Sequence, residues 1–214
     1  MRYLFCFFVL SSAFCFPQCL TADIAIDVSS EGTHFNGNWT LRYEFTTNRD
    51  LVLSSLGFFD DGANGLADAH EVGIWDAAGN LVASTTVLPS DLLNGRFRYS
   101  AIAPVTLLAG QVYVVGGNNY DNDSAIRSDL GGTHSVHPDL NIVAGRWANG
   151  SFGEPTQRIN NSSIYYTTVS FQFDAVTPVP EPASGVFVVL VLSSAIFQRR
   201  RRRSWGRVAI QRLC

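Results

Sequence analysis

One loop of this chain, residues 60–71, carries acidic side chains at a spacing that suits a calcium ion. Oxygen donors fall at its first, fifth, ninth and twelfth positions, which are Asp60, Asn64, Asp68 and Glu71. Gly65 stands sixth and the carbonyl of Leu66 seventh, as in an EF-hand loop of hard oxygen ligands. The third position is Gly62, which has no side chain to contribute. The spacing therefore predicts a calcium site formed by Asp60, Asn64, Leu66, Asp68 and Glu71.

An acidic turn explains the same loop without any ion. Asn-Gly pairs and aspartates favour turns, because they tolerate left-handed backbone and bond to their own main chain. The sequence leaves both interpretations open, so the cofactor prediction is calcium at this loop or no cofactor. His70, next to Glu71, is expected to be a hydrogen-bonded structural residue at the head of a strand.

Trp147 is a second candidate, as an aromatic contact for carbohydrate. It lies between Arg146 and the turn-forming Asn149-Gly150, which favours an exposed ring that stacks on a sugar. The chain has neither a Gly-x-Ser-x-Gly element nor a Walker-type loop. We therefore predict that the protein is not an enzyme. Two alternatives stay open: a surface carbohydrate-binding module, and a glycoside hydrolase that pairs Asp and Glu side chains.

Residues 23–176 are expected to form the domain that positions these side chains. Apolar and polar residues alternate at 41–45 and 164–173, and Gly, Asn and Asp punctuate the chain between short segments. Further strands are expected at 24–28, 51–59, 71–75, 81–88, 97–102 and 111–116, with long loops over 116–142. The pattern predicts an all-β fold, an antiparallel β-sandwich of jelly-roll or immunoglobulin-like type.

The charges of the chain are divided between two segments. Residues 23–180 hold seventeen acids and seven arginines, whereas residues 199–214 hold seven arginines and no acid. Such asymmetry points to membrane or targeting functions. The acidic domain lacks the basic face that nucleic acid requires, so no nucleic-acid partner is expected.

The first 22 residues have the composition of a secretory signal peptide. Arg2 precedes an apolar run that ends at Phe16, and polar alternation starts at Asp23. The four cysteines lie near the two ends of the chain, at Cys6, Cys15, Cys19 and Cys214. The exported domain is therefore expected to fold without disulfides.

The C-terminal segment, 177–203, has three parts in order. The first is a proline-flanked acidic element, comprising Val179, Pro180, Glu181 and Pro182. An apolar run follows and predicts a transmembrane helix at about 183–198. The third part is a cluster of Arg199, Arg200, Arg201, Arg202 and Arg203, which should stay on the cytoplasmic side. Residues 204–214 then form a cytoplasmic extension.

This three-part tail resembles the PEP-CTERM sorting signal of Gram-negative bacterial envelopes. The resemblance implies that an exosortase processes the protein near Pro180-Glu181-Pro182 and releases it or transfers it to the surface. It also implies an association with exopolysaccharide and the biofilm matrix. The expected partners are thus the membrane, an exosortase and exopolysaccharide. The precursor is expected in the inner membrane, and the product on the outer surface or in the extracellular matrix of a Gram-negative-type bacterium.

The domain has a resemblance of its own, which covers about residues 35–125. The stretches Leu56 to Asp60 with Asn64-Gly65-Leu66, His70 to Asp76, and Tyr99 to Tyr113 look like a β-sandwich domain of many exported PEP-CTERM proteins. That domain has no assigned biochemical role, so the resemblance implies an architecture without an activity. Together the two resemblances imply an exported, membrane-anchored or exosortase-processed envelope or matrix protein that is not a catalyst.

Overall fold

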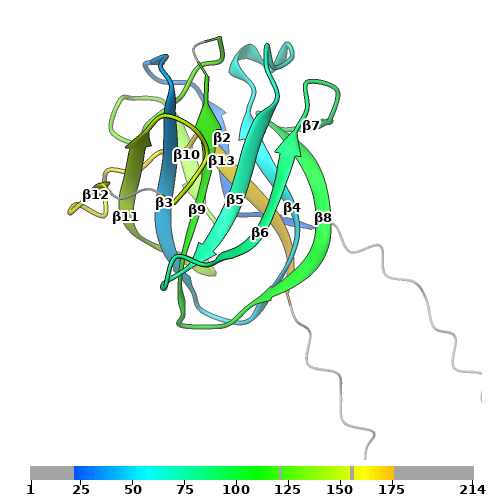
Figure 1. The fold of residues 1–214 in the computed structure, drawn as a ribbon, viewed down its shortest axis with the longest axis vertical. Helices are drawn as coiled ribbons and strands as arrows, with labels where there is room; N and C mark the ends of the chain where they lie inside the picture. Colours follow the sequence, from blue (N-terminus) through cyan, green and yellow to red (C-terminus); the bar gives the residue numbers. More distant parts are fainter. Residues whose placement is uncertain (1–21, 121, 155–156, 176–214) are drawn as a thin grey trace, which may run out of the picture. The chain divides into compact units, whose positions relative to one another are not determined.

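Two antiparallel β-sheets lie face to face (Figure 1). They enclose apolar side chains between them. The computed structural model describes residues 22–120, 122–154 and 157–175. All of them lie in the first of two units into which the chain divides after Val176. The one helical element within these ranges is the 3-10 turn η1 (Asp61–Ala63). The prediction of an all-β antiparallel sandwich is confirmed.

The strands form two large sheets and one small one. The first sheet has the order β1 (Asp23–Ile24), β13 (Val169–Ala175), β4 (Leu51–Phe59), β8 (Phe97–Leu107), β7 (Leu92–Asn94). The second has the order β12 (Gln157–Ile159), β11 (Leu140–Asn149), β3 (Trp39–Thr47), β9 (Val112–Asn119), β5 (His70–Asp76), β6 (Leu81–Val87). A two-stranded sheet pairs β10 (Thr133–Val136) with β2 (Ile26–Ser30).

Alternation along the strands builds the core. On β3, Tyr43 and Phe45 are fully buried between the two sheets, and the Phe45 ring lies 5.2 Å from the Phe171 ring of β13, centroid to centroid. Successive strand residues face opposite sides, so Arg42 and Glu44 lie on the outer face of the six-stranded sheet. Each large apolar side chain buried in this way contributes about 1.5–3 kcal/mol to the stability of the fold.

The agreement between the predicted and the observed strands varies along the chain. The predicted segment 51–59 coincides with β4, whereas the segment predicted at 164–173 begins at Val169. The long loop predicted over 116–142 is wrong in part, because β10 and the start of β11 lie within it. A register shift between Ile142 and Ala144 interrupts the alternation of β11, so its sequence does not resemble a strand.

The sandwich has two distinct ends. Ala175, the last residue of β13, pairs with Leu51, and Asp23 pairs with Phe173, so the described chain enters and leaves at one end. Val169 pairs with Phe58 at the other end, where the loops that follow β2, β4 and β9 gather (top of Figure 1). At about 3.3 Å per residue, the length of β4 separates the two ends by roughly 25 Å.

Several predicted segments fall outside the part of the chain that the structure describes. They are residues 1–21 of the predicted signal peptide, the sorting element 179–182, the predicted span 183–198, the arginines 199–203 and the extension 204–214. Within the described ranges, no helix has the length and apolar character needed to cross a bilayer.

Candidate functional site

Asp60, the first residue of the predicted calcium loop, is fully buried and already has partners. Its carboxylate pairs with Nε of Arg98 at 2.7 Å and accepts the Gly65 amide at 3.1 Å from each oxygen. Arg98 lies on β8, directly across from Phe58 of β4, and also donates to the Asp91 carbonyl at 2.9 Å. Asp60 therefore closes its own loop and ties it to the neighbouring strand.

The other predicted calcium ligands point in different directions. Glu71 is exposed, and its β5 neighbour His70 is buried on the opposite face of the strand. An oxygen of Asp68 accepts the side-chain amide of Asn122 at 2.8 Å, while Asn64 is exposed and the Leu66 side chain packs in the core. The carboxylates of Asp60, Asp68 and Glu71 thus do not converge. Over the described ranges, only Glu31, His34 and Asp61 bring three metal-ligating side chains together.

A buried network around Asp123 fixes the second half of this loop. The Asp123 carboxylate accepts the backbone amides of Ala67 and Asp68 at 2.9–3.0 Å and pairs with Nε2 of His70 at 2.9 Å. The other ring nitrogen of His70, Nδ1, lies 2.8 Å from the Asn118 carbonyl oxygen. Both ring nitrogens of His70 are thus within hydrogen-bond distance of an oxygen atom. His70 also stacks on Phe58 with 3.7 Å between ring centroids, which gives it the structural role expected from the sequence.

An aromatic pocket of about 400 Å³ opens at the loop end of the six-stranded sheet. It is lined by Phe35, Trp39, Leu41, Arg127, Trp147 and Tyr166. Trp147 pairs with Leu41 across β11 and β3, so its ring is on the inner side of the sheet near the edge, where it is half-buried. The structure therefore places the predicted sugar-binding residue in a pocket with three other aromatic rings.

Two of the residues that line this pocket, Arg127 and Tyr166, carry polar groups, and an ion pair holds Arg127 in place. Nε and NH2 of Arg127 donate to the two carboxylate oxygens of Asp129, at 2.6 and 3.2 Å. This hydrogen bonding raises the pKa of Arg127, against the opposing effect of its burial, so the pocket wall keeps its positive charge. Burial raises the pKa of the Tyr166 phenol, which stays a neutral donor and acceptor. The pocket thus combines apolar ring faces with two hydrogen-bonding groups.

A second pocket, of about 320 Å³, is lined mainly by polar residues. Its lining residues are Asn38, Asp68, Ala69, Tyr120 and Asn122. Asn38 immediately precedes Trp39 of the aromatic pocket, so the two depressions share one loop. Asp68, predicted as a calcium ligand, is the one acid among the lining residues that the structure describes.

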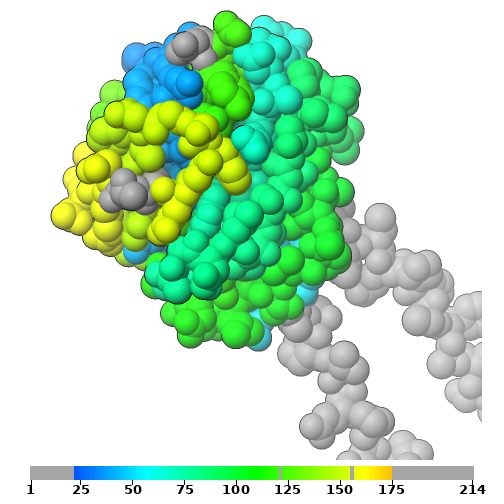
Figure 2. Space-filling view, in the orientation of Figure 1, coloured from blue at the N-terminus to red at the C-terminus, as the bar shows by residue number. Residues whose placement is uncertain are grey.

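The segment that follows β11, drawn in yellow in Figure 2, covers part of the outer face of the six-stranded sheet. Thr40 donates to the Ser151 carbonyl at 3.2 Å, and the Phe152 ring lies 5.1 Å from the Trp75 ring, centroid to centroid. The Arg42 guanidinium is enclosed below this cover, 3.5 Å from the centroid of the Trp75 ring. Trp75 is therefore buried, as its apolar strand suggests.

Sequence reasoning missed the residues that organise these sites. Asp123 is 56 positions from its partner Ala67, and Arg98 is 38 positions from Asp60. His34 is 27 positions from Asp61. A local spacing pattern cannot show pairs at such separations. The signal that was present is the concentration of polar residues in the segments between β2 and β3 and after β9, which the fold brings to one end.

The chain belongs to the family described as a domain of unknown function (DUF4082), whose profile matches residues 29–167. The match spans the strands from β3 to β12 and both pockets. No curated protein matches the chain.

Proposed function

We propose that this chain is an exported, non-catalytic protein of a bacterial envelope or extracellular matrix, and that its β-sandwich binds carbohydrate. The observation that carries the binding proposal is the aromatic pocket at the loop end of the sandwich. Its volume of about 400 Å³ lies within the roughly 300–1,000 Å³ common for small-ligand sites. Apolar ring faces with a few fixed polar groups suit a sugar ring, which has apolar faces and a rim of hydroxyls.

The composition of the pocket favours binding over hydrolysis. A standard glycosidase places two carboxyl groups across the scissile bond. None of the six described residues that line the aromatic pocket is an acid. Among the described residues of the polar pocket, Asp68 is the one acid. We therefore favour the carbohydrate-binding alternative over the hydrolase alternative.

The strand order supports the jelly-roll type among the two predicted sandwich types. We letter eight strands B to I in chain order: β1, β3, β4, β5, β6, β8, β9 and β13. The first sheet then contains the order B-I-D-G, and the second sheet contains C-H-E-F. That is the pairing of a jelly roll, with β11 and β12 added at the edge beside β3. Lectin domains use this architecture, which is an analogy of fold and adds only background to the pocket argument.

Binding to a glycan array and titration with the exopolysaccharide of the producing bacterium test the carbohydrate proposal. The full-length chain should bind at least one glycan, and Trp147→Ala should weaken that binding at least tenfold. Leu92→Ala, which removes a side chain that is 77% exposed on the other sheet, should leave the affinity unchanged. Absence of binding to every glycan, or equal affinity in Trp147→Ala, would contradict the proposal.

The export proposal is supported by the sequence of the two ends. β1 begins at Asp23, directly after the predicted signal peptide, and β13 ends at Ala175, just before the proline-rich element. We propose that residues 183–198 anchor the precursor as a transmembrane helix, and that an exosortase then processes the tail near Glu181. A tether that starts after Ala175 begins at the end of the sandwich opposite the pocket.

Fractionation of cells that produce the wild-type chain or Glu181→Ala tests the sorting proposal. The wild-type product should be shorter than its precursor and leave the inner membrane, whereas Glu181→Ala should accumulate there at precursor size. Asp174→Ala, a substitution before the tail begins, serves as the control and should be processed normally. Identical size and location of wild type and Glu181→Ala would exclude exosortase processing at this element.

A further inference from the structure

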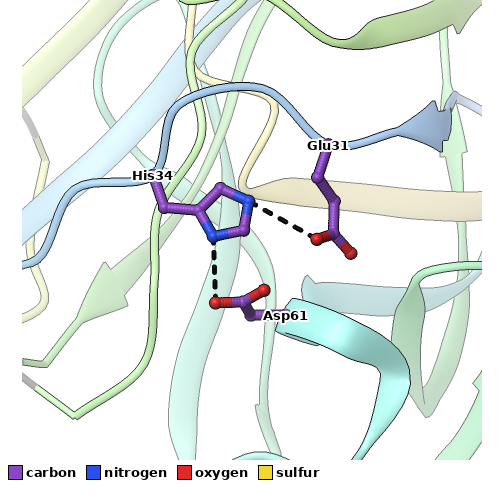
Figure 3. Close-up of side chains that lie close together, drawn as sticks. All are labelled: Glu31, His34 and Asp61. Atoms are coloured by element: carbon purple, nitrogen blue, oxygen red, sulfur yellow. Dashed lines mark hydrogen bonds and ion pairs between the residues drawn. The ribbon is translucent and has the colours of Figure 1, made fainter.

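A histidine and two acids meet where two loops touch at the loop end of the sandwich. Glu31 and His34 lie between β2 and β3, and Asp61 is the first residue of η1 (Figure 3). Each of the three offers one ligand atom, and these atoms lie within 4.8 Å of one another. The three side chains are partly buried, with 21–38% of each exposed. None of them belongs to either pocket described above.

The hydrogen bond between His34 and Asp61 selects the tautomer of the imidazole. Nδ1 of His34 lies 3.0 Å from a carboxylate oxygen of Asp61, which accepts, so Nδ1 carries the hydrogen. In the neutral ring, Nε2 then presents its lone pair. Nε2 is buried and has no hydrogen-bond partner within the described structure. A carboxylate behind the imidazole is the common arrangement for a histidine that binds a metal through its other nitrogen.

The position of Glu31 matches a metal ion between the two side chains. Nε2 of His34 lies 3.6 Å from Oε2 of Glu31, which is too far for a good hydrogen bond. Two metal bonds of about 2.0–2.2 Å at a tetrahedral angle place their ligand atoms about 3.3–3.6 Å apart. The separation in the structure therefore fits two ligands of one zinc-sized ion.

The other oxygen of Glu31 is occupied, which fixes the direction of Oε2. Oε1 accepts the Gly62 amide at 3.1 Å and also pairs with Arg96. Oε2 is thereby turned toward His34, as Figure 3 shows. An imidazole nitrogen with a carboxylate oxygen suits Zn²⁺ and similar transition metals, whereas Ca²⁺ takes six to eight oxygen ligands.

We propose that Glu31 and His34 bind one transition-metal ion of the Zn²⁺ class. Oε2 of Glu31 and Nε2 of His34 are its protein ligands, and water completes the coordination. Asp61 positions the imidazole through Nδ1 and is a positioning residue. The bound ion ties Glu31 to His34 within the segment between β2 and β3, and the hydrogen bond from His34 to Asp61 links that segment to η1. This site differs from the calcium site predicted in the loop 60–71 and is independent of the carbohydrate proposal.

Titration calorimetry with ZnCl₂ alone tests the proposal on the full-length chain, purified in mild detergent. Its four cysteines are replaced by serine, because thiolates bind zinc strongly. The parent should bind one Zn²⁺ per chain. His34→Gln should abolish this binding, and Asp61→Asn should weaken it about 10–100-fold, as loss of a partner behind a metal-binding histidine does.

His137→Gln is the matched control. His137 is also partly buried and lies 3.6–3.8 Å from the carboxylates of Asp139 and Asp23, so a nonspecific histidine effect would appear there too. It should keep the parent affinity. Absence of saturable Zn²⁺ binding in the parent, or parent-like affinity in His34→Gln, would overturn the proposal. Circular dichroism checks the fold of each variant. Glu31→Gln, which should also abolish binding, decides the question if His34→Gln does not fold.

Discussion

At the scale of single residues, Arg42 presents the sharpest conflict between charge and burial. Its side chain is 0% exposed, and none of its three guanidinium nitrogens has a hydrogen-bond partner in the part of the chain described. Desolvation by burial lowers the pKa of Arg42 to about 8, while nearby Glu154 opposes this shift and Arg146 adds to it. The stacking on Trp75 compensates for only part of this cost, because cation–π contacts contribute about 2 kcal/mol when desolvated.

Replacing this residue should stabilise the protein. We expect Arg42→Met to raise the free energy of unfolding by about 1–2 kcal/mol at pH 6, because an apolar side chain removes the cost of the buried charge. The measurement is urea denaturation of the full-length chain. A loss of more than about 1 kcal/mol would instead show that the contact with Trp75 outweighs desolvation.

The advantage of Arg42→Met should decrease with rising pH. Below about pH 8, both folded and unfolded wild-type chains keep the Arg42 proton. Above that pH the folded chain releases it while the unfolded chain keeps it, so the wild type gains stability. The difference between variant and wild type should therefore shrink between pH 7 and 9. Other titrating groups are common to both chains, and neither contains lysine.

Asp123 should contribute far more to the free energy of unfolding than Asp129, a nearby acid in the same loop region. Its removal leaves His70 and two backbone amides without their acceptor in a buried site. We expect Asp123→Ala to lower the free energy of unfolding by about 3–5 kcal/mol. Asp129→Ala breaks an ion pair whose members are about one-third exposed and should cost less than about 1 kcal/mol. Similar losses in these two variants would contradict the assigned role of the Asp123 network.

At the scale of elements, Glu44 connects three neighbouring strands. Its Oε2 on β3 accepts Nε of Arg146 on β11 at 3.0 Å and Nε of Arg158 on β12 at 2.9 Å. Burial alone would raise the pKa of Glu44, but the hydrogen bonds and charges of the two arginines hold it below its ordinary value. β12 pairs with β11 through three residues, and Arg158 stands directly opposite Arg146. The carboxylate therefore prevents repulsion between these two arginines at the sheet edge.

Glu44→Gln should loosen β12 in a pH-dependent manner. We expect a loss of about 1 kcal/mol at pH 7, since the arginines are 23% and 38% exposed and partly screened. A carboxylate with a lowered pKa stabilises the fold above its unfolded pKa, and the effect is lost as pH falls through the folded pKa. The stability difference should thus shrink below about pH 4. Faster hydrogen exchange at 157–159 in the variant, with β4 unchanged, would locate the effect. Uniform exchange changes would argue against it.

The loop 60–71 shows which part of a site the sequence can predict. The acidic residues and the glycine turn were evident from local spacing, and the flanking strands β4 and β5 were predicted at 51–59 and 71–75. The partners of these acids were not evident, because Arg98 and Asp123 reach the loop from other strands and loops. Trp147 was identified from its exposed setting, but the rings around it come from segments far away in the chain.

At the scale of the whole molecule, the alternation of apolar and polar residues predicted a sandwich. The pairing of the strands in the structure defines its topology. A period of two residues identifies strands such as β2, in which Ile26 and Val28 are buried and Asp27 between them is exposed. It does not determine which strands pair. The pairing of β13 with both β1 and β4 joins segments more than 100 residues apart. That pairing places the chain entry and exit at one end and both pockets at the other.

Reducing agents should not change the thermal stability of the sandwich. All four cysteines lie outside the described strands, at residues 6, 15, 19 and 214, so the core formed by Tyr43, Phe45, Phe171 and their neighbours stabilises the fold. We expect the melting temperature of the full-length chain to change by less than about 1 °C on addition of dithiothreitol. A native disulfide contributes about 2–4 kcal/mol, and each kcal/mol corresponds to about 2–4 °C in a domain of this size. A drop of about 5 °C or more would therefore show that a bond between the terminal cysteines stabilises the domain.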